Sequence, residues 1–344
     1  MRIGITYNLK SDSHPSSISR IPEDAAEEFD QPETIEALQK VLSSGGDEVF
    51  PLGGDLGILG KIKDRSIEFV FNIAEGFQGR SREAHIPALL ELMGIPYSGS
   101  DPLALALTLD KALTKRIAFS LEIPTPQFWV LDGTGDLQSV TGRFPLFVKP
   151  AWQGSSKGIR LSSRVGDRTQ LEKEVNRLFE DYPEEPVLVE EYIPGREITV
   201  GVLGSPPEIV GLMEIAFQDP VQKDFCYSLE VKQDWKKQAA YHFPARLAES
   251  LQQRICDSAL RLFKALRLRD VARFDFRVSP EGKFYFLEVN PLPGLSPESG
   301  DLVILAQKKG WSYRDLILKI THSALSRYPG LGLGNQKGKM IAAR

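Results

Sequence analysis

The pattern of apolar and polar positions divides the first hundred residues into alternating strands and helices. Short apolar runs at residues 2–7, 48–52 and 67–72 predict buried strands. Helical spacing of apolar side chains over residues 33–43 and 84–93 predicts amphipathic helices, each followed closely by a glycine that favours a helix end. This alternation indicates a parallel sheet with helices on its faces.

The rest of the chain is expected to form two further units and a tail. The elements expected there are a helical region over 103–121, strands near 127–131, 144–149 and 187–193, a helix near 169–178, a strand over 198–203, a helix over 247–266, a strand pair over 273–290 and a helix near 313–326. We therefore predict an α/β protein with domains at 1–104, 105–196 and 197–330, followed by a flexible tail at 331–344.

The strand pair over residues 273–290 carries the most informative side chains. A two-residue turn centred on Glu281 and Gly282 would place Asp275 directly opposite Glu288. Side chains alternate along a strand, so the opposite face would form an apolar layer. That layer is expected to contain Phe274, Phe276, Val278, Tyr285, Leu287 and Val289.

The polar face of this strand pair is a candidate metal site. It holds Asp275 and Glu288 together with Arg273 and Asn290. Two facing carboxylates repel each other, and a bound cation removes that conflict. Carboxylate and amide oxygens suit Mg²⁺, which proteins usually hold together with substrate phosphates. The alternative is an ordinary solvated strand face.

Two other segments carry candidate binding residues. A strand ending at Lys149 precedes a Gly-Ser-Ser-Lys-Gly loop at 154–158, whose backbone N–H groups could surround phosphate oxygens; the alternative is a plain surface turn. Residues 187–200 read as strand, Pro-Gly turn, strand. Glu190 and Tyr192 share a face that could border a planar base, and Glu197 could reach ribose hydroxyls; the alternative is a hairpin with charged edges.

Composition narrows the classes of protein that fit. The 344 residues, 42% apolar and 26% charged, are typical of a globular protein with substantial cores. A formal net charge of −4 argues against nucleic-acid binding. Two cysteines and four scattered histidines form neither a disulfide framework nor a metal-binding spacing. We expect no membrane span and no signal peptide, and hence a cytoplasmic protein.

The order of these motifs resembles the ATP-grasp ligases, and most closely the D-alanine–D-alanine ligase family. The resemblance covers roughly residues 65–326 and rests on motifs in the family's order: Asp110-Lys111, Val148-Lys149-Pro150, the 154–158 loop, 190–197, 273–276 and 287–291. It implies a three-domain ATP-grasp architecture with an N-terminal Rossmann-like domain. The implied activity is an ADP-forming ligation of two amino acids in peptidoglycan precursor synthesis.

The resemblance also implies roles for individual residues. The residues implied to bind ATP are Lys111, Lys149, Ser155, Glu190, Tyr192, Ile193 and Glu197. Those implied to bind two Mg²⁺ ions, or Mn²⁺ instead, are Asp275, Glu288 and Asn290. Those implied in catalysis are Arg273, Ser156 and Lys232, and those around the attacking amino acid are Gly294 and Ser299. The implied partners are small amino-acid substrates and a second copy of the chain in a homodimer.

The chain departs from the family pattern where the carboxylate donor would bind. The usual Gly-Gly-x-Ser-x-Glu after the first strand is absent, and Asn72-Ile73-Ala74-Glu75-Gly76 replaces the usual His-Gly pair. The candidate donor-binding residues are Asn8, Glu75 and Arg82. Asn8 and Glu75 lie in the two segments that depart from the family pattern, and Arg82 lies in the turn at 79–83, which could face the donor carboxylate. A ligase for a different amino acid or small carboxylic acid is therefore the second candidate, and a nucleotide-binding regulatory protein the third.

Overall fold

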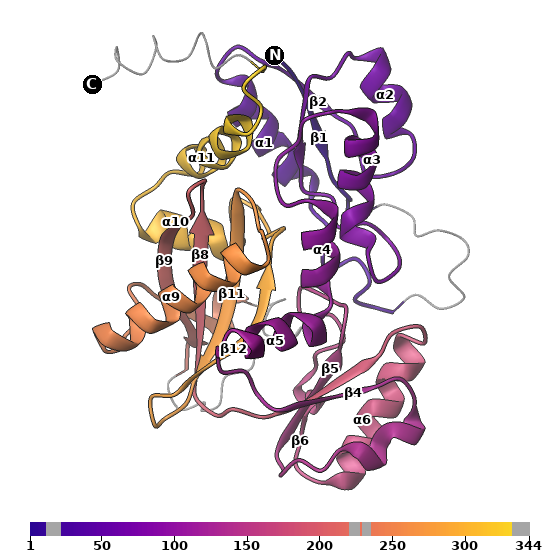
Figure 1. Ribbon diagram of the computed structural model, residues 1–344, viewed down its shortest axis with the longest axis vertical. Helices are drawn as coiled ribbons and strands as arrows, with labels where there is room; N and C mark the ends of the chain where they lie inside the picture. Colours follow the sequence, from indigo (N-terminus) through magenta and orange to yellow (C-terminus); the bar gives the residue numbers. More distant parts are fainter. Residues whose placement is uncertain (12–21, 220–227, 229–234, 332–344) are drawn as a thin grey trace.

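The computed structural model describes residues 1–11, 22–219, 228 and 235–331, which form three sheets with helices packed against them (Figure 1). The strands are β1 (Arg2–Thr6), β2 (Glu48–Pro51), β3 (Phe69–Asn72), β4 (Phe128–Leu131), β5 (Leu146–Pro150), β6 (Arg164–Val165), β7 (Val187–Glu191), β8 (Arg196–Leu203), β9 (Glu208–Phe217), β10 (Ala239–His242), β11 (Val271–Val278) and β12 (Phe284–Asn290). The helices are α1 (Pro32–Ser43), α2 (Ile58–Asp64), α3 (His85–Met93), α4 (Pro102–Leu109), α5 (Lys111–Ser120), α6 (Arg168–Asp181), α8 (Trp235–Gln238), α9 (Glu249–Ala265), α10 (Asp301–Lys308) and α11 (Tyr313–Ser326).

The first sheet is the parallel sheet that the sequence predicts. Its strand order is β2-β1-β3, and both pairings are parallel. Phe69 and Phe71 share a core with α1, α10 and α11, whereas Val70 packs with α2 and α3 on the other face. Both faces are thus buried, which explains the nearly continuous apolar runs of these strands. None of the helices in the described ranges is long and apolar enough to cross a membrane.

The other two sheets are antiparallel, and in Figure 1 they lie below the first sheet, with the five-stranded sheet near the middle of the view and the four-stranded sheet at the bottom. The four-stranded sheet has the order β4-β7-β5-β6 and packs on α6. The five-stranded sheet has the order β10-β9-β8-β11-β12 and packs on α9. The sequence did not predict β6, β9, β10, α2, α8 or α10. The α/β fold class is confirmed.

The predicted hairpin over residues 187–200 is wrong. β7 belongs to the four-stranded sheet and β8 to the five-stranded sheet, so Pro194 and Gly195 lead the chain from one sheet to the other. Gly195 has φ +128°, and a Cβ there would lie 2.1 Å from the carbonyl oxygen of Val278. Only glycine allows this close approach of two backbone segments.

The predicted register of β11 and β12 is confirmed at the polar end. Asp275 pairs with Glu288, and Arg273 with Asn290. A bulge follows, because Phe276 pairs with Phe286 and leaves Leu287 unpaired. The bulge shifts the alternation by one residue. The core side chains of β12 are therefore Phe284 and Phe286 together with Val289; Val289 was predicted there, whereas Tyr285 and Leu287 were predicted in place of the two phenylalanines.

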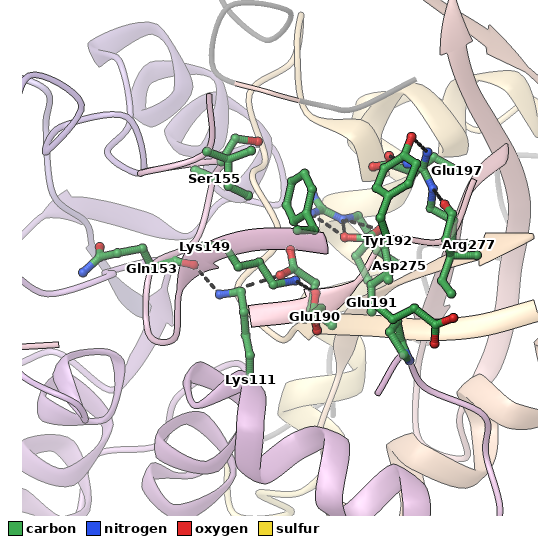
Figure 2. A pocket seen from close by; sticks show the side chains of 18 of the residues that line it. Lys111, Lys149, Gln153, Ser155, Glu190, Glu191, Tyr192, Glu197, Asp275 and Arg277 are labelled. Carbon is green, nitrogen blue, oxygen red and sulfur yellow. Dashed lines mark hydrogen bonds and ion pairs between the residues drawn. The ribbon is translucent and has the colours of Figure 1, made fainter. Parts of the chain in front are cut away.

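The predicted helical region over 103–121 consists of two helices. Asp110 ends α4 and caps α5, since its carboxylate accepts a hydrogen bond from the backbone N–H of Leu113 at 2.9 Å. An aspartate cap satisfies an N–H group that has no partner within the helix. Lys111 is consequently the first residue of α5, and its side chain points into the region between the two antiparallel sheets (Figure 2).

Candidate active site

A cavity of about 980 Å³, partly open to solvent, lies between the two antiparallel sheets (Figure 2). β5 and β7 supply one wall, and β8, β11 and β12 supply the other. The side chains around it are Lys111, Pro126, Phe147, Lys149, Gln153, Ser155, Ser156, Ile159, Glu190, Glu191, Tyr192, Ile193, Glu197, Arg273, Asp275, Arg277, Leu287, Glu288 and Asp301. Eleven of the residues that were expected to bind ATP or Mg²⁺ or to act in catalysis are thereby brought together.

Glu190 organises the lysines on the wall formed by β5 and β7. Its carboxylate forms ion pairs with Lys149 at 2.8 Å and with Lys115 at 2.6 Å, and all three side chains are buried. Although burial opposes ionisation, the two lysines lower the pKa of Glu190 to about 2. Glu190 is thus a fixed anion that holds Lys149 at the cavity. Sequence reasoning missed Lys115, although it lies four residues after Lys111.

Removing the buried lysine is expected to destabilise the protein. In Lys115→Met, Glu190 keeps only Lys149, and Thr125 loses the hydrogen bond that Lys115 donates at 3.0 Å. Breaking a buried pair by removing one partner leaves a charge without full compensation, so we expect a loss of about 3 kcal/mol. Urea unfolding of this variant and of Lys40→Met, an exposed site on α1, measures the difference. Equal stability of the two variants would contradict this account of Glu190.

The opposite end of the cavity has an aromatic and cationic lining. Phe147 stacks on Tyr192 with ring centroids 6.4 Å apart. The guanidinium of Arg277 donates to the hydroxyl of Tyr192 at 3.1 Å and to the backbone oxygen of Ile193 at 2.7 Å, and it pairs with Glu197 at 3.2 Å. Burial, together with nearby carboxylates, raises the pKa of Glu197 to about 7 despite Arg277. The bulge adds Leu287 to this lining. Planar apolar surface beside hydrogen-bonding groups is typical of a base-binding site.

The polar ends of β11 and β12 gather negative charge at the cavity. Asp275 accepts hydrogen bonds from Thr199 and Arg273, and Arg273 also pairs with Asp301 at 3.3 Å. Burial and the opposing Glu288 raise the pKa of Asp275, although Arg273 partly offsets them. Among the residues that the structure describes, Lys111 is the one ion-pair partner of Glu288, at 3.6 Å, so the oxygens of Glu288 keep room for further ligands. Hard oxygen donors with surplus negative charge fit a bound Mg²⁺.

The loop after β5 contributes Ser155 and Ser156 to the lining of the cavity. Ser155 and Ser156 have φ values of +50° and +62°, the left-handed region that costs energy for residues other than glycine. Such strained backbone persists where surrounding contacts hold it and is frequent at ligand-binding loops. Here the backbone N–H of Gly154 donates to Glu28, and Lys157 pairs with Glu28 at 2.8 Å.

Three predicted site residues in the described ranges are not among those that line this cavity. Asn290 lines a neighbouring cavity, and its side-chain oxygen accepts a hydrogen bond from the backbone of Leu292 at 2.8 Å. Gly294 and Ser299 are exposed in the segment before α10, where the Ser299 hydroxyl bonds to that of Ser296 at 3.0 Å. Lys232 lies outside the described residues.

The neighbouring cavity is also partly open to solvent, and it shares a wall with the first. The residues around it are Glu28, Glu75, Glu83, Thr108, Leu109, Lys111, Gly154, Ser155, Arg273, Glu288, Val289, Asn290 and Pro291. Of the three candidates for donor binding, Glu75 lines this cavity, whereas Asn8 and Arg82 are not among its lining residues. Sequence reasoning missed Glu28, because nothing in its local pattern indicates that the polar segment before α1 reaches the loop after β5. It also missed Glu83, because only the arginines of the turn at 79–83 were expected at the site.

The turn at 79–83 was expected to face the donor carboxylate, but its arginines do not line this cavity. Arg80 pairs with Asp110 at 3.0 Å and lies over the ring of Trp152. Arg82 is buried, and both nitrogens at its end are engaged: one donates to Glu28 at 2.8 Å and the other to the backbone oxygen of Trp152 at 2.9 Å. These arginines therefore hold acidic and backbone groups in place behind the cavity wall.

Comparison with known proteins identifies similar sequences along most of the chain. The profile of the family described as D-ala D-ala ligase C-terminus matches residues 122–322. The protein y4sG of Sinorhizobium fredii is 35% identical over 310 residues, which cover 87% of this chain and 89% of that protein. The D-alanine–D-alanine ligase of Aquifex aeolicus is 34% identical over 285 residues, which cover 83% of this chain and 92% of that ligase.

Solved structures are similar in fold. The D-alanine–D-alanine ligase of Bacillus anthracis complexed with ATP superposes with a TM-score of 0.71 and covers 96% of this chain and all of that one, at 24% identity. The VanG D-Ala:D-Ser ligase of Enterococcus faecalis has the same TM-score at 22% identity and covers 94% of this chain and 99% of that one. At these identities the likeness shows the fold alone.

Proposed function

This chain belongs to the D-alanine–D-alanine ligase family, and we propose that it is an ATP-dependent, ADP-forming ligase that joins two amino acids through an amide bond. The observation that carries the proposal is the cavity between the two antiparallel sheets. One wall presents fixed lysines and the other presents paired carboxylates, with a serine loop over both. The first candidate reaction joins two molecules of D-alanine, as in peptidoglycan precursor synthesis.

ATP would bind across the cavity with its base at one end. Phe147, Tyr192, Ile193 and Leu287 would border the adenine, and Glu197 would accept hydrogen bonds from the ribose. Lys111 and Lys149 would contact the phosphates, with Ser155 and Ser156 in the loop above them. Glu190 would act through Lys115 and Lys149, because its oxygens are already engaged by them. This arrangement matches cationic groups to the anionic part of the nucleotide.

Asp275, Glu288 and Asn290 would hold two Mg²⁺ ions, or Mn²⁺ in their place. The ions would neutralise charge on the phosphates during transfer. Two observations on the described residues support a cation here. The carboxylate of Glu288 has few contacts, and the pKa of Asp275 is raised. Arg273 would donate hydrogen bonds to oxygens that gain charge during acyl transfer, together with Lys232 and Ser156. Gly294 and Ser299 would lie near the carboxylate of the attacking amino acid.

The reaction would have two steps. A donor carboxylate oxygen attacks the γ-phosphorus of ATP, which gives an acyl phosphate and releases ADP. The amine of the acceptor then attacks the acyl carbon, and phosphate leaves with one of the donor's carboxylate oxygens. Holding both substrates in line lowers the entropic part of the barrier.

We also propose that the protein works as a homodimer in the cytoplasm, on the basis of the family resemblance. Sedimentation equilibrium of the purified chain measures the first part directly. A mass close to twice 38.3 kDa is expected, and a single species at 38.3 kDa would contradict it.

The second candidate function is a ligase with a different donor, and the acidic lining of the second cavity favours it. We expect D-alanine as sole substrate to support poor turnover, because Glu75 and Glu83 create an environment more acidic than a small neutral side chain needs. ADP release with Mg²⁺ and D-alanine alone, measured against a panel of other amino acids, tests both candidates. A kcat/KM of about 10⁴ M⁻¹s⁻¹ or more with D-alanine, typical of an efficient enzyme, would refute the prediction.

A further inference from the structure

The second cavity has two chemically different ends. At one end it shares Lys111, Ser155, Arg273 and Glu288 with the ATP cavity. At the other end it is lined by three carboxylates: Glu28, Glu75 and Glu83. A donor whose carboxylate lies at the shared wall would therefore extend the rest of its structure toward the acidic end.

The cations at the acidic end are already engaged. Glu28 forms ion pairs with Arg82 and Lys157, each at 2.8 Å. These two cations hold the pKa of Glu28 below its usual range even though burial opposes them. Among the described residues, neither Glu75 nor Glu83 has a hydrogen bond or ion pair to another side chain. Glu83 is only 7% exposed, and its buried Oε2 atom has no hydrogen-bond partner within the part of the chain that the structure describes.

The balance of charge around Arg82 is negative. Four carboxylates stabilise the charge of Arg82, those of Glu28, Glu75, Glu83 and Glu185, and Lys157, which pairs with Glu28, is the second cation of the group. Lys111 also acts on Glu83, and Asp30 on Glu75, so with all eight groups ionised three cations face five carboxylates and the formal charge of the cluster is −2. Burial and mutual repulsion raise the pKa of Glu75, and burial raises that of Glu83 to about 7. Buried charge without compensation is costly, so the cluster favours a ligand that brings positive charge.

Building on the ligase reaction proposed above, we propose that the donor is a diamino acid, whose two ammonium groups bind at Glu75 and Glu83 while its carboxylate lies at the shared wall beside Arg273. A monoamino acid such as alanine brings one positive charge and leaves the other carboxylate uncompensated. A diamino acid compensates both. Its side-chain ammonium takes no part in bond formation and serves recognition alone.

Direct binding of matched donors tests this inference without an acceptor. The purified chain with Mg²⁺ and the non-hydrolysable analogue adenylyl imidodiphosphate is titrated calorimetrically with ornithine and norvaline, which differ by the terminal amine, and with lysine and norleucine. Both enantiomers of each are used. We expect the diamino acid of at least one pair to bind at least 10-fold more tightly than its uncharged counterpart. Equal or tighter binding of norvaline and norleucine would overturn the inference.

Two variants assign the preference to the acidic end. In Glu75→Gln, and separately in Glu83→Gln, the ratio of the two affinities is expected to fall toward one, whereas Glu36→Gln on the exposed face of α1 leaves it unchanged. Each substitution removes a repelling charge, so the melting temperature is expected to stay level or rise. A preference that survives both substitutions would refute the assignment.

ADP release separates this inference from the function on which it rests. If alanine or norvaline stimulates ADP release and ornithine and lysine do not, the ligase reaction stands and the diamino-acid donor is refuted. If none of the amino acids stimulates ADP release, the proposed reaction itself fails, and the inference fails with it.

Discussion

Replacing Glu288 with glutamine is expected to abolish turnover and weaken Mg²⁺ binding while leaving the fold intact. The substitution keeps the shape of the side chain but removes one of the two carboxylates that face each other across β11 and β12. Because a metal ion at this site contributes several kcal/mol of transition-state stabilisation, we expect kcat to fall about 10³-fold. The measurements are ADP release as a function of Mg²⁺ concentration and thermal unfolding.

The matched control for this prediction is Glu281→Gln, which lies on the exposed turn between the same two strands. It is expected to behave as wild type in both measurements. Loss of one of two repelling carboxylates relieves strain in the apo protein, so the Glu288→Gln variant should unfold at the wild-type temperature or above it. Wild-type activity in that variant would show that the carboxylate pair is not the metal site.

Replacing Arg273 with lysine is expected to lower kcat about 100-fold or more with little change in the melting temperature. Lysine keeps the charge but loses the planar guanidinium, which can donate several hydrogen bonds at once. The expected magnitude is that of losing one donor to a developing oxyanion. Steady-state kinetics and thermal unfolding of Arg273→Lys measure the two quantities, and Arg269→Lys, whose partner is Asp101, serves as the control.

Because Arg273 forms ion pairs, the melting temperature of the variant has to be measured as well as kcat. Its guanidinium contacts Asp275 at 2.9 Å and Asp301 at 3.3 Å, so a purely structural role is the competing explanation. A structural role predicts a melting temperature lower by several degrees with kcat nearly unchanged. That outcome would remove Arg273 from the catalytic groups and leave it as a residue that positions Asp275.

The pairing of Asp275 with Glu288 was predictable because strand alternation and a short connection constrain it from local sequence alone. The position of Leu287 was not, because a bulge inserts one residue without any mark in the apolar pattern and moves the side chains between the bulge and the turn to the face opposite the predicted one. The same local reasoning joined β7 and β8 into a hairpin. Their separation into two sheets depends on pairings with strands far away in the sequence.

The candidate site shows the same division between local and long-range information. Lys149, the serine loop and the carboxylates of β11 and β12 stand in recognisable local patterns. Glu28 reaches the loop at Gly154 across 126 residues of sequence, and Arg82 reaches Glu28 across 54. Contacts of this kind depend on the complete fold, so the acidic cavity could not be predicted from the residues that form it.

The route of a single oxygen atom tests the central claim most directly. A donor amino acid that supports turnover is labelled with ¹⁸O in its carboxylate, and the phosphate released with ADP is analysed by mass spectrometry. Attack of the carboxylate on the γ-phosphorus predicts one ¹⁸O atom in the released phosphate for each amide bond formed. Unlabelled phosphate, or AMP and diphosphate as products, would contradict an acyl-phosphate ligase.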